Sequence, residues 1–213
     1  MSLAETLQEA NTRSRNKIPK EILSVMDNAT NKLISEGISK QAIQEGEAFP
    51  EFSLPNVKNK SVSLTTLTEK GPLVISFYRG GWCPYCNIEL RALQQALPEF
   101  NKRGANLVAV SPETPDNSLS TTEKNELSFE VLSDVDNLLA KQIGLVFKLP
   151  NEIQSIYDSF GIDVAKHNDN DKFELPVAAT IVVNKSGRVV YRFVNEDYTK
   201  RAEISEIIYA LDK

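Results

Sequence analysis

The sequence predicts an α/β fold in which a central mixed β-sheet carries helices on both faces. A short apolar run, Pro72–Phe77, is followed by a turn, an amphipathic helix and a second apolar run at Asn106–Ser111. Strand, helix and strand in this order form a βαβ unit with a right-handed crossover. Further on, Ala179–Val183 and Arg188–Val194 flank the turn sequence Asn-Lys-Ser-Gly, which is a strong hairpin signal. The sheet therefore combines parallel and antiparallel strands.

Residues 1–45 form a predicted helical extension, and residues 46–213 the main α/β domain. One apolar face of the extension contains Ile18, Ile22, Val25, Ala29 and Leu33, and Gly37 is a suitable helix stop. A second short helix is expected at Ser39–Glu45. We expect this extension to pack on the domain or on a second subunit.

Several further elements are predicted along the domain. Gly46–Leu54 (GEAFPEFSL) contains Pro50 and is typical of an edge strand or an extended entry segment. After the first buried strand, Cys86, Leu90, Leu93 and Leu97 recur at helical spacing. Because Pro98 lacks a backbone donor, this helix is expected to kink or end near Leu97.

Helices and strands also alternate in the second half of the domain. A polar helix is predicted at Pro115–Asn125, a short strand at Phe129–Leu132 and a short helix at Asn137–Ile143. A helix carrying Ile153 and Tyr157 is expected at about 153–160, a solvated Asn/Asp loop at 168–171 and a closing helix at Arg201–Leu211. This order of elements is that of the thioredoxin-like architecture.

Both cysteines of the chain, Cys83 and Cys86, lie at the turn between the first buried strand and its helix. Pro84 suits the first helical position, and Cys83 at the N-cap is expected to accept N–H groups of the first turn. A helix N-terminus stabilises a thiolate and lowers thiol pKa values to about 3.5–7.5. Since residues three apart on a helix have Cβ atoms about 5–6 Å apart, the pair is suited to a dithiol–disulfide cycle.

Composition excludes several other classes. The 213 residues carry a net charge of −5, which disfavours a nucleic-acid partner, and no run of 18 apolar residues predicts a membrane span. The N-terminus lacks a secretion signal, so a cytoplasmic location is expected. Zinc needs four ligands, but His167 is the only histidine, so we expect no metal or other cofactor. We expect His167 to be exposed and uninvolved.

These motifs resemble the peroxiredoxins, the alkyl hydroperoxide reductase and thiol-specific antioxidant family of the thioredoxin superfamily, over about residues 46–211. GEAFPEFSL resembles the opening segment of the family, Cys86–Glu89 its Cys-x-x-Glu, and Thr180–Val190 its supporting hairpin. RGxWCPYC and an FVxxDYTxRAE segment, here Phe193–Glu203, are similar to a peroxiredoxin-like branch. The resemblance implies a thiol peroxidase that reduces hydrogen peroxide and organic hydroperoxides. It also implies a thioredoxin- or glutathione-type reductant and a homodimer.

The family pattern Pro-x-x-x-Thr-x-x-Cys is incomplete in this chain. Cys86 falls on the peroxidatic cysteine, Cys83 on the threonine and Arg79 on the proline, while the usual arginine position holds Ala178. The missing guanidinium would orient the peroxide and stabilise developing charge. Arg79 and Arg201 are the candidates to replace it.

The sequence alone leaves three functions open. In a peroxidase, the alignment makes Cys86 the attacking thiolate and Cys83 its partner in the disulfide. In a protein disulfide oxidoreductase, Cys83 attacks and Cys86 resolves the mixed disulfide. A non-catalytic thioredoxin-fold module would instead act through the helical extension. Supporting roles are expected for Trp82, which with Tyr85 would shield the site, and for Glu89, which would hold an arginine or relay a proton.

Overall fold

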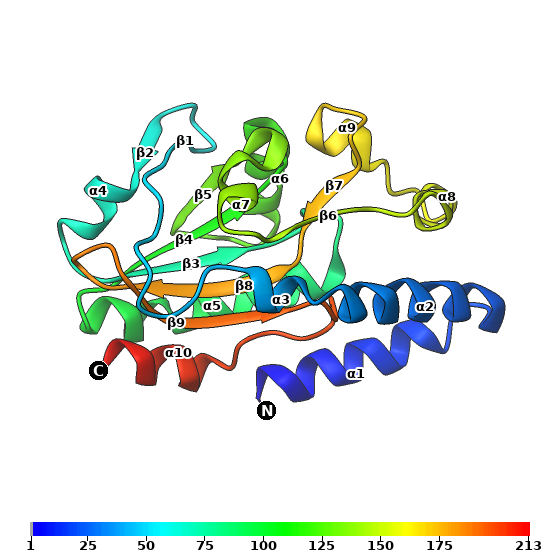
Figure 1. The fold of residues 1–213 in the computed structure, drawn as a ribbon, viewed down its shortest axis with the longest axis horizontal. Helices are drawn as coiled ribbons and strands as arrows, with labels where there is room; N and C mark the ends of the chain where they lie inside the picture. Colours follow the sequence, from blue (N-terminus) through cyan, green and yellow to red (C-terminus); the bar gives the residue numbers. More distant parts are fainter. Residues whose placement is uncertain (1) are drawn as a thin grey trace.

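The computed structural model describes residues 2–213. Its centre is a five-stranded sheet with the order β5–β4–β3–β8–β9 (Figure 1). The parallel strands are β3 (Leu73–Phe77), β4 (Asn106–Ser111) and β5 (Glu130–Ser133). The hairpin of β8 (Ala178–Val183) and β9 (Val189–Asn195) adds antiparallel strands, with β8 next to β3. The predicted mixed sheet is confirmed.

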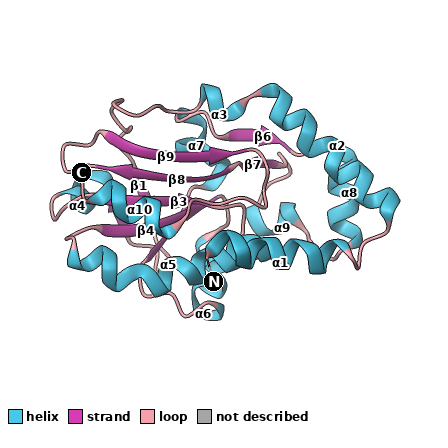
Figure 2. Cartoon of the chain, turned by 90° about the horizontal axis from the view of Figure 1, so that it is seen from below, coloured by secondary structure: helices cyan, strands magenta, loops and turns pink. Residues whose placement is uncertain are grey.

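Helices cover both faces of this sheet. Side chains of β3 alternate, so that Val74 packs on one face and Leu73, Ile75 and Phe77 pack on the other. The first face is covered by α5 (Pro84–Lys102), α10 (Ile204–Leu211) and α1 (Leu3–Arg15), as Figures 1 and 2 show. The second face carries α4 (Leu64–Thr68) and α7 (Leu138–Gln142). The β3–α5 junction therefore lies in the middle of the fold.

The N-terminal extension is helical, as predicted, and consists of α1, α2 (Lys20–Glu36) and α3 (Ile38–Gln41). Gly37 ends α2 in the left-handed conformation with φ 68°. Ile18 is not on the apolar face of α2, because Pro19 is the N-cap of that helix. In Figure 2, α2 runs beside α8 (Asn151–Ser159), with which it is in contact.

The entry segment is mostly extended, with strand β1 confined to Ser53–Pro55. It pairs with β2 (Ser61–Ser63) in a separate two-stranded ribbon. The predicted polar helix is α6 (Pro115–Lys124). Two short strands, β6 (Val146–Lys148) and β7 (Glu174–Pro176), form a second ribbon that the sequence pattern did not indicate.

Two predictions in the second half need correction. The solvated loop begins after Asn168, because Asn168 is buried at the end of α9 (Val164–Asn168). A 3₁₀ turn, Val135–Asn137, precedes α7. The closing helix α10 begins at Ile204 and not at Arg201.

The expected break at Pro98 is also wrong, since α5 continues through Pro98 to Lys102. A proline inside a helix costs about 3 kcal/mol, mainly through one lost hydrogen bond and a steric clash. The last turn of α5 carries Phe100, which has no exposed surface and packs in the core. Burial of a phenylalanine contributes about 1.5–3 kcal/mol. Together with the hydrogen bonds that remain, this burial offsets the penalty.

No helix within residues 2–213 is both long enough and apolar enough to cross a membrane.

Candidate active site

The two cysteines lie at the turn from β3 to α5. Cys83 is the N-cap residue, with φ −84° and ψ 117°, and Pro84 is the first helical residue, as predicted. The Asn87 amide donates to the carbonyls of Gly81 and Cys83 at 2.8 and 2.9 Å, which fixes the turn to the helix. The expected cap bond to the sulfur is absent, because no N–H of the first turn donates to Cys83 Sγ in the structure of residues 2–213. Its sulfur faces an arginine instead.

A buried carboxylate holds the turn from the other side. Glu113 Oε2 accepts the N–H of Gly81 at 2.9 Å, and Glu113 Oε1 lies 2.9 Å from His167 Nδ1. The expectation that His167 is exposed is therefore wrong, since α9 brings its half-buried ring onto Glu113. A Cβ atom on Gly81 would lie 1.9 Å from Thr121 Oγ1. Only glycine fits at this position.

Each cysteine faces its own guanidinium. An Nη atom of Arg79 lies 3.2 Å from Cys83 Sγ, and an Nη atom of Arg201 lies 3.2 Å from Cys86 Sγ. Neither cysteine has exposed surface, and both thiols are free. Both arginines that the sequence offered as replacements thus lie in the site.

Arg201 has a carboxylate partner. Its side chain has no exposed surface and forms a buried ion pair with Glu89, whose other oxygen is near the hydroxyls of Ser76 and Thr180, at 3.3 and 3.4 Å. Burial raises the pKa of Glu89, although the guanidinium of Arg201 opposes this shift. Of the two roles considered for Glu89, the observed contact is that of holding an arginine. Arg201 reaches Cys86 because it precedes α10 instead of belonging to it.

Arg79 has no such partner. No carboxylate among residues 2–213 forms an ion pair with its guanidinium, which donates to the Tyr157 hydroxyl at 2.9 Å. The guanidinium carbon lies 5.1 Å from the ring centroid of Trp82 and 4.6 Å from that of Tyr198. Aromatic faces stabilise a cation only partly. An anion on Cys83 is therefore the natural counter-ion of this buried charge.

The pKa values of the two thiols are shifted in opposite directions. Burial raises the pKa of Cys83, but the hydrogen bond from Cys86 and the positive charges of Arg79 and Arg201 outweigh it and lower this pKa to well below the ordinary value. Burial and the neighbouring Cys83 raise the pKa of Cys86 well above that value. The pair is thus arranged to hold one proton on Cys86 and the negative charge on Cys83.

Aromatic rings cover the pair. Trp82 lies with its ring centroid 5.4 Å from that of Tyr157, and Tyr85 lies 5.5 Å from Tyr198. The Tyr85 hydroxyl donates to Asn11 of α1 at 3.1 Å. Sequence reasoning did not single out Tyr157 or Tyr198 for the site. Tyr198 lies in the late segment that carries the resemblance, whereas Tyr157 gave only a helical pattern.

The sequence model of the AhpC/TSA family matches residues 46–192. The chain belongs to the AhpC/TSA family. It is 28% identical over 148 residues to "Peroxiredoxin Q, chloroplastic" of Populus jackii, covering 68% of this chain and 69% of that protein. It is 30% identical over 103 residues to "Peroxiredoxin Bcp" of Escherichia coli (strain K12), covering 48% of this chain and 65% of that protein. These similarities make it a peroxiredoxin-type oxidoreductase, a thiol peroxidase.

Solved structures share the fold. Peroxidoxin BcpB from Mycobacterium tuberculosis superimposes with a TM-score of 0.63 at 19% identity, covering 80% of this chain and 97% of that chain. The reduced 2-Cys peroxiredoxin of Plasmodium vivax gives a TM-score of 0.61 at 20% identity, covering 80% of this chain and 95% of that chain. The family match begins at residue 46 and ends at residue 192. The extension, Tyr198 and Arg201 therefore lie outside the matched segment, although Arg201 contacts Cys86 and both Asn11 of α1 and Tyr198 contact Tyr85.

Proposed function

We propose that peroxide reduction in this protein proceeds through a dithiol–disulfide cycle of Cys83 and Cys86, with Cys83 as the attacking thiolate. Its sulfur attacks one oxygen of a hydroperoxide ROOH, the O–O bond breaks, and Cys83 becomes a sulfenic acid. The departing RO⁻ takes the proton of Cys86 and leaves as ROH. The Cys86 thiolate then attacks the sulfenic sulfur, forming the disulfide and releasing hydroxide, which solvent protonates to water.

The observation that carries this proposal is the pairing of Arg79. Glu89 neutralises Arg201, whereas among residues 2–213 the guanidinium of Arg79 contacts the Cys83 sulfur, a phenol and aromatic rings but no carboxylate. A buried cation favours an anion at the position where no other negative charge is available. The thiolate, which is the nucleophile of such chemistry, is therefore favoured on Cys83.

Cys86 has the complementary role. While Cys83 is negative, Cys86 retains its proton, because burial and the neighbouring Cys83 raise the pKa of Cys86. Oxidation of Cys83 removes that negative charge, so Arg201 at 3.2 Å then favours the Cys86 thiolate. The family resemblance favours the opposite order, with attack by Cys86, and trapping of the sulfenic acid distinguishes the two orders.

A thioredoxin-type disulfide oxidoreductase is the second candidate, and Cys83-Pro84-Tyr85-Cys86 with its low-pKa first cysteine favours it. However, neither cysteine has exposed surface, which hinders attack on a disulfide of another protein. A small peroxide needs a much smaller opening to reach the sulfur than a disulfide of another protein does. Reduction of insulin disulfides at a rate similar to peroxide reduction would favour this second function.

The remaining assignments complete the proposal. We expect a thioredoxin- or glutathione-type reductant, a cytoplasmic location, no nucleic-acid or membrane partner, and a homodimer. The division into an extension (1–45) and a domain (46–213) also stays a prediction. Bacterial and chloroplastic proteins are both among the relatives, so fractionation of the source cells tests the location.

The test of the cycle uses purified, fully reduced protein and one equivalent of hydrogen peroxide. We expect rapid peroxide loss and a product mass lower by two hydrogens, with a peptide that links Cys83 to Cys86. A variant with both cysteines changed to serine is the control. Peroxide loss no faster than with free cysteine, or a sulfenic acid without disulfide, would contradict the cycle.

A further inference from the structure

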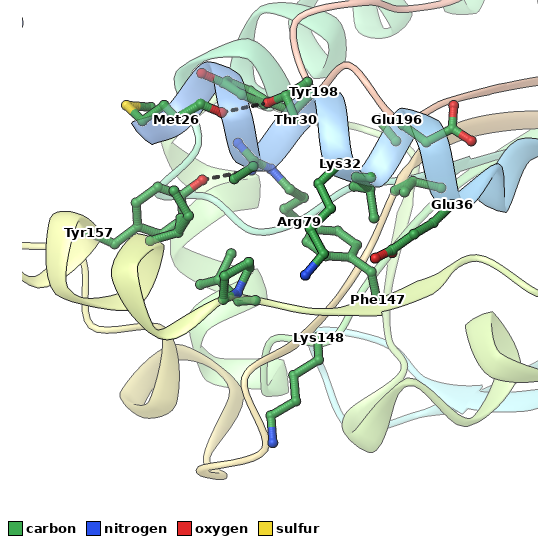
Figure 3. Close-up of a pocket in the computed structure, with 17 residues that line it drawn as sticks. Met26, Thr30, Lys32, Glu36, Arg79, Phe147, Lys148, Tyr157, Glu196 and Tyr198 are labelled. Atoms are coloured by element: carbon green, nitrogen blue, oxygen red, sulfur yellow. Dashed lines mark hydrogen bonds between the residues drawn. The ribbon is translucent and has the colours of Figure 1, made fainter. Parts of the chain in front are cut away.

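A cavity lies between the N-terminal extension and the active-site turn. Its volume is about 100 Å³. Its apolar walls come from α2 on one side and from the β6–α8 segment on the other, as Figure 3 shows. These walls consist of Met26, Ala29, Leu33, Phe147, Leu149 and Ile153.

The α2 wall is not packed like the other helices on the core. No residue of α2 is buried, although Met26 and Ala29 touch the apolar cluster of α8, and Leu33 touches the core of the sheet. The apolar face of α2 therefore lies over the cavity as well as over packed side chains of α8 and the sheet. Lys32 and Lys148, both exposed, mark the side where the cavity meets solvent.

The inner end of the cavity is the guanidinium that faces Cys83. Arg79, Tyr157 and Tyr198 line this end, and the dashed bond from Arg79 to Tyr157 is visible in Figure 3. Arg79 Nε is buried without a partner, while one Nη contacts Cys83 at 3.2 Å. A polar group that enters the cavity can therefore bind Arg79, the guanidinium that contacts the Cys83 sulfur.

The cavity that borders Arg201, on the Cys86 side of the site, is smaller. A cavity of about 50 Å³ borders Arg201, between α1 residues Leu7 and Gln8 and the segment Thr199–Lys200. It is half as large as the cavity under α2. Of the two arginines, Arg79 thus borders the larger cavity.

We propose that the cavity under α2 binds the alkyl chain of an organic hydroperoxide, with the peroxide group at Arg79, and that α2 selects the substrate. This inference rests on the proposed peroxidase cycle. An engineered apolar cavity of about 150 Å³ binds benzene, so about 100 Å³ suits a narrower, unbranched chain. Each methylene buried there strengthens binding about fourfold. The reaction is the one already written, with ROH as the alcohol that leaves through the cavity.

The test compares n-hexyl hydroperoxide with hydrogen peroxide. We expect wild-type kcat/KM to be at least about tenfold higher for the hexyl compound, because several methylenes are buried. Ala29→Phe fills the cavity, and the ratio of the two kcat/KM values should fall about tenfold. Asn31→Phe, on the exposed side of the same helix, is the control and should leave the ratio unchanged. A ratio near one in wild type, or equal ratios in wild type and Ala29→Phe, overturns the proposal.

A second readout does not depend on catalysis. Trp82 is the only tryptophan, and its ring is 5.1 Å from the Arg79 guanidinium, so its fluorescence reports on the inner end. Titration with 1-hexanol should change this fluorescence saturably in wild type and in Asn31→Phe, but not in Ala29→Phe. If Ala29→Phe does not fold, Leu33→Ala should raise the relative rate with the longer n-octyl hydroperoxide. Protein that consumes neither peroxide contradicts the proposed function, while the hexanol titration still supports or overturns the binding site.

Discussion

Replacement of Arg79 by glutamine removes the positive charge next to Cys83 and keeps a side chain of similar length. Two unit charges about 4 Å apart interact by about 4 kcal/mol at an effective dielectric constant of 20. A cation at this distance typically lowers the pKa of its partner by about 1–3 units, which corresponds to about 1.4–4 kcal/mol. Because an Nη atom of Arg79 lies 3.2 Å from Cys83 Sγ and its charge helps to lower the pKa of this thiol, we expect Arg79→Gln to raise the pKa of Cys83.

The assay follows the ultraviolet absorbance of the thiolate against pH in reduced, oxygen-free protein. Peroxide consumption at neutral pH should fall about ten- to a hundredfold and recover as the pH is raised. Arg91→Gln is the matched control, since Arg91 is an exposed arginine of α5 that bonds Asn125 and no sulfur. Identical thiolate titrations of Arg79→Gln and Arg91→Gln would refute the reasoning.

The Arg79→Gln substitution should also alter how the free energy of unfolding depends on pH. A thiol whose pKa is lower in the folded than in the unfolded state stabilises the folded state above its unfolded pKa of about 8.5. This contribution is lost as the pH falls through the folded pKa. Since the pKa of Cys83 is lowered, reduced wild type should become more stable as the pH rises towards about 8.5, and Arg79→Gln less so. Urea denaturation at several pH values measures the difference.

Three further substitutions test the surroundings of the site. Tyr157→Phe removes one hydrogen bond to the Arg79 guanidinium, which should cost about 1.5–3 kcal/mol and slow peroxide reduction about ten- to a hundredfold in stopped-flow measurements. Gly81→Ala places a Cβ atom 1.9 Å from Thr121 Oγ1, so the free energy of unfolding in urea should fall by about 1–3 kcal/mol or more; an unchanged midpoint would argue against the close contact. Pro98→Ala restores a helical N–H in α5 and should stabilise the fold against urea, by up to about 3 kcal/mol, without changing peroxide kinetics.

Much of the fold could be predicted from the sequence because its strands and helices have clear apolar periods. The buried strands β3 and β4 and the hairpin β8–β9 follow from continuous apolar runs and a turn sequence. The prediction failed at Pro98, where local propensity is overridden by burial of Phe100. It also missed α9, a helix of five residues whose polar sequence gives no period.

The site could be predicted only in part. The Cys-x-x-Cys spacing and the strand–helix turn placed both sulfurs, and the two arginines followed from gaps in the family pattern. The assignment of each arginine to one cysteine depends on tertiary contacts, as does the position of Glu89 between Arg201 and two hydroxyls. His167 was misjudged because its partner, Glu113, is 54 residues away in the sequence.

The identity of the attacking sulfur is tested most directly by trapping the sulfenic acid in single-cysteine variants. Reduced Cys86→Ser and Cys83→Ser are each mixed with one equivalent of peroxide in the presence of dimedone, and the adducts are located by mass spectrometry. The pairing of Cys83 with Arg79 predicts a rapid adduct on Cys83 in Cys86→Ser and a slow reaction of Cys83→Ser. A rapid adduct on Cys86 in Cys83→Ser, with an inert Cys86→Ser, would contradict it and assign the attack to Cys86.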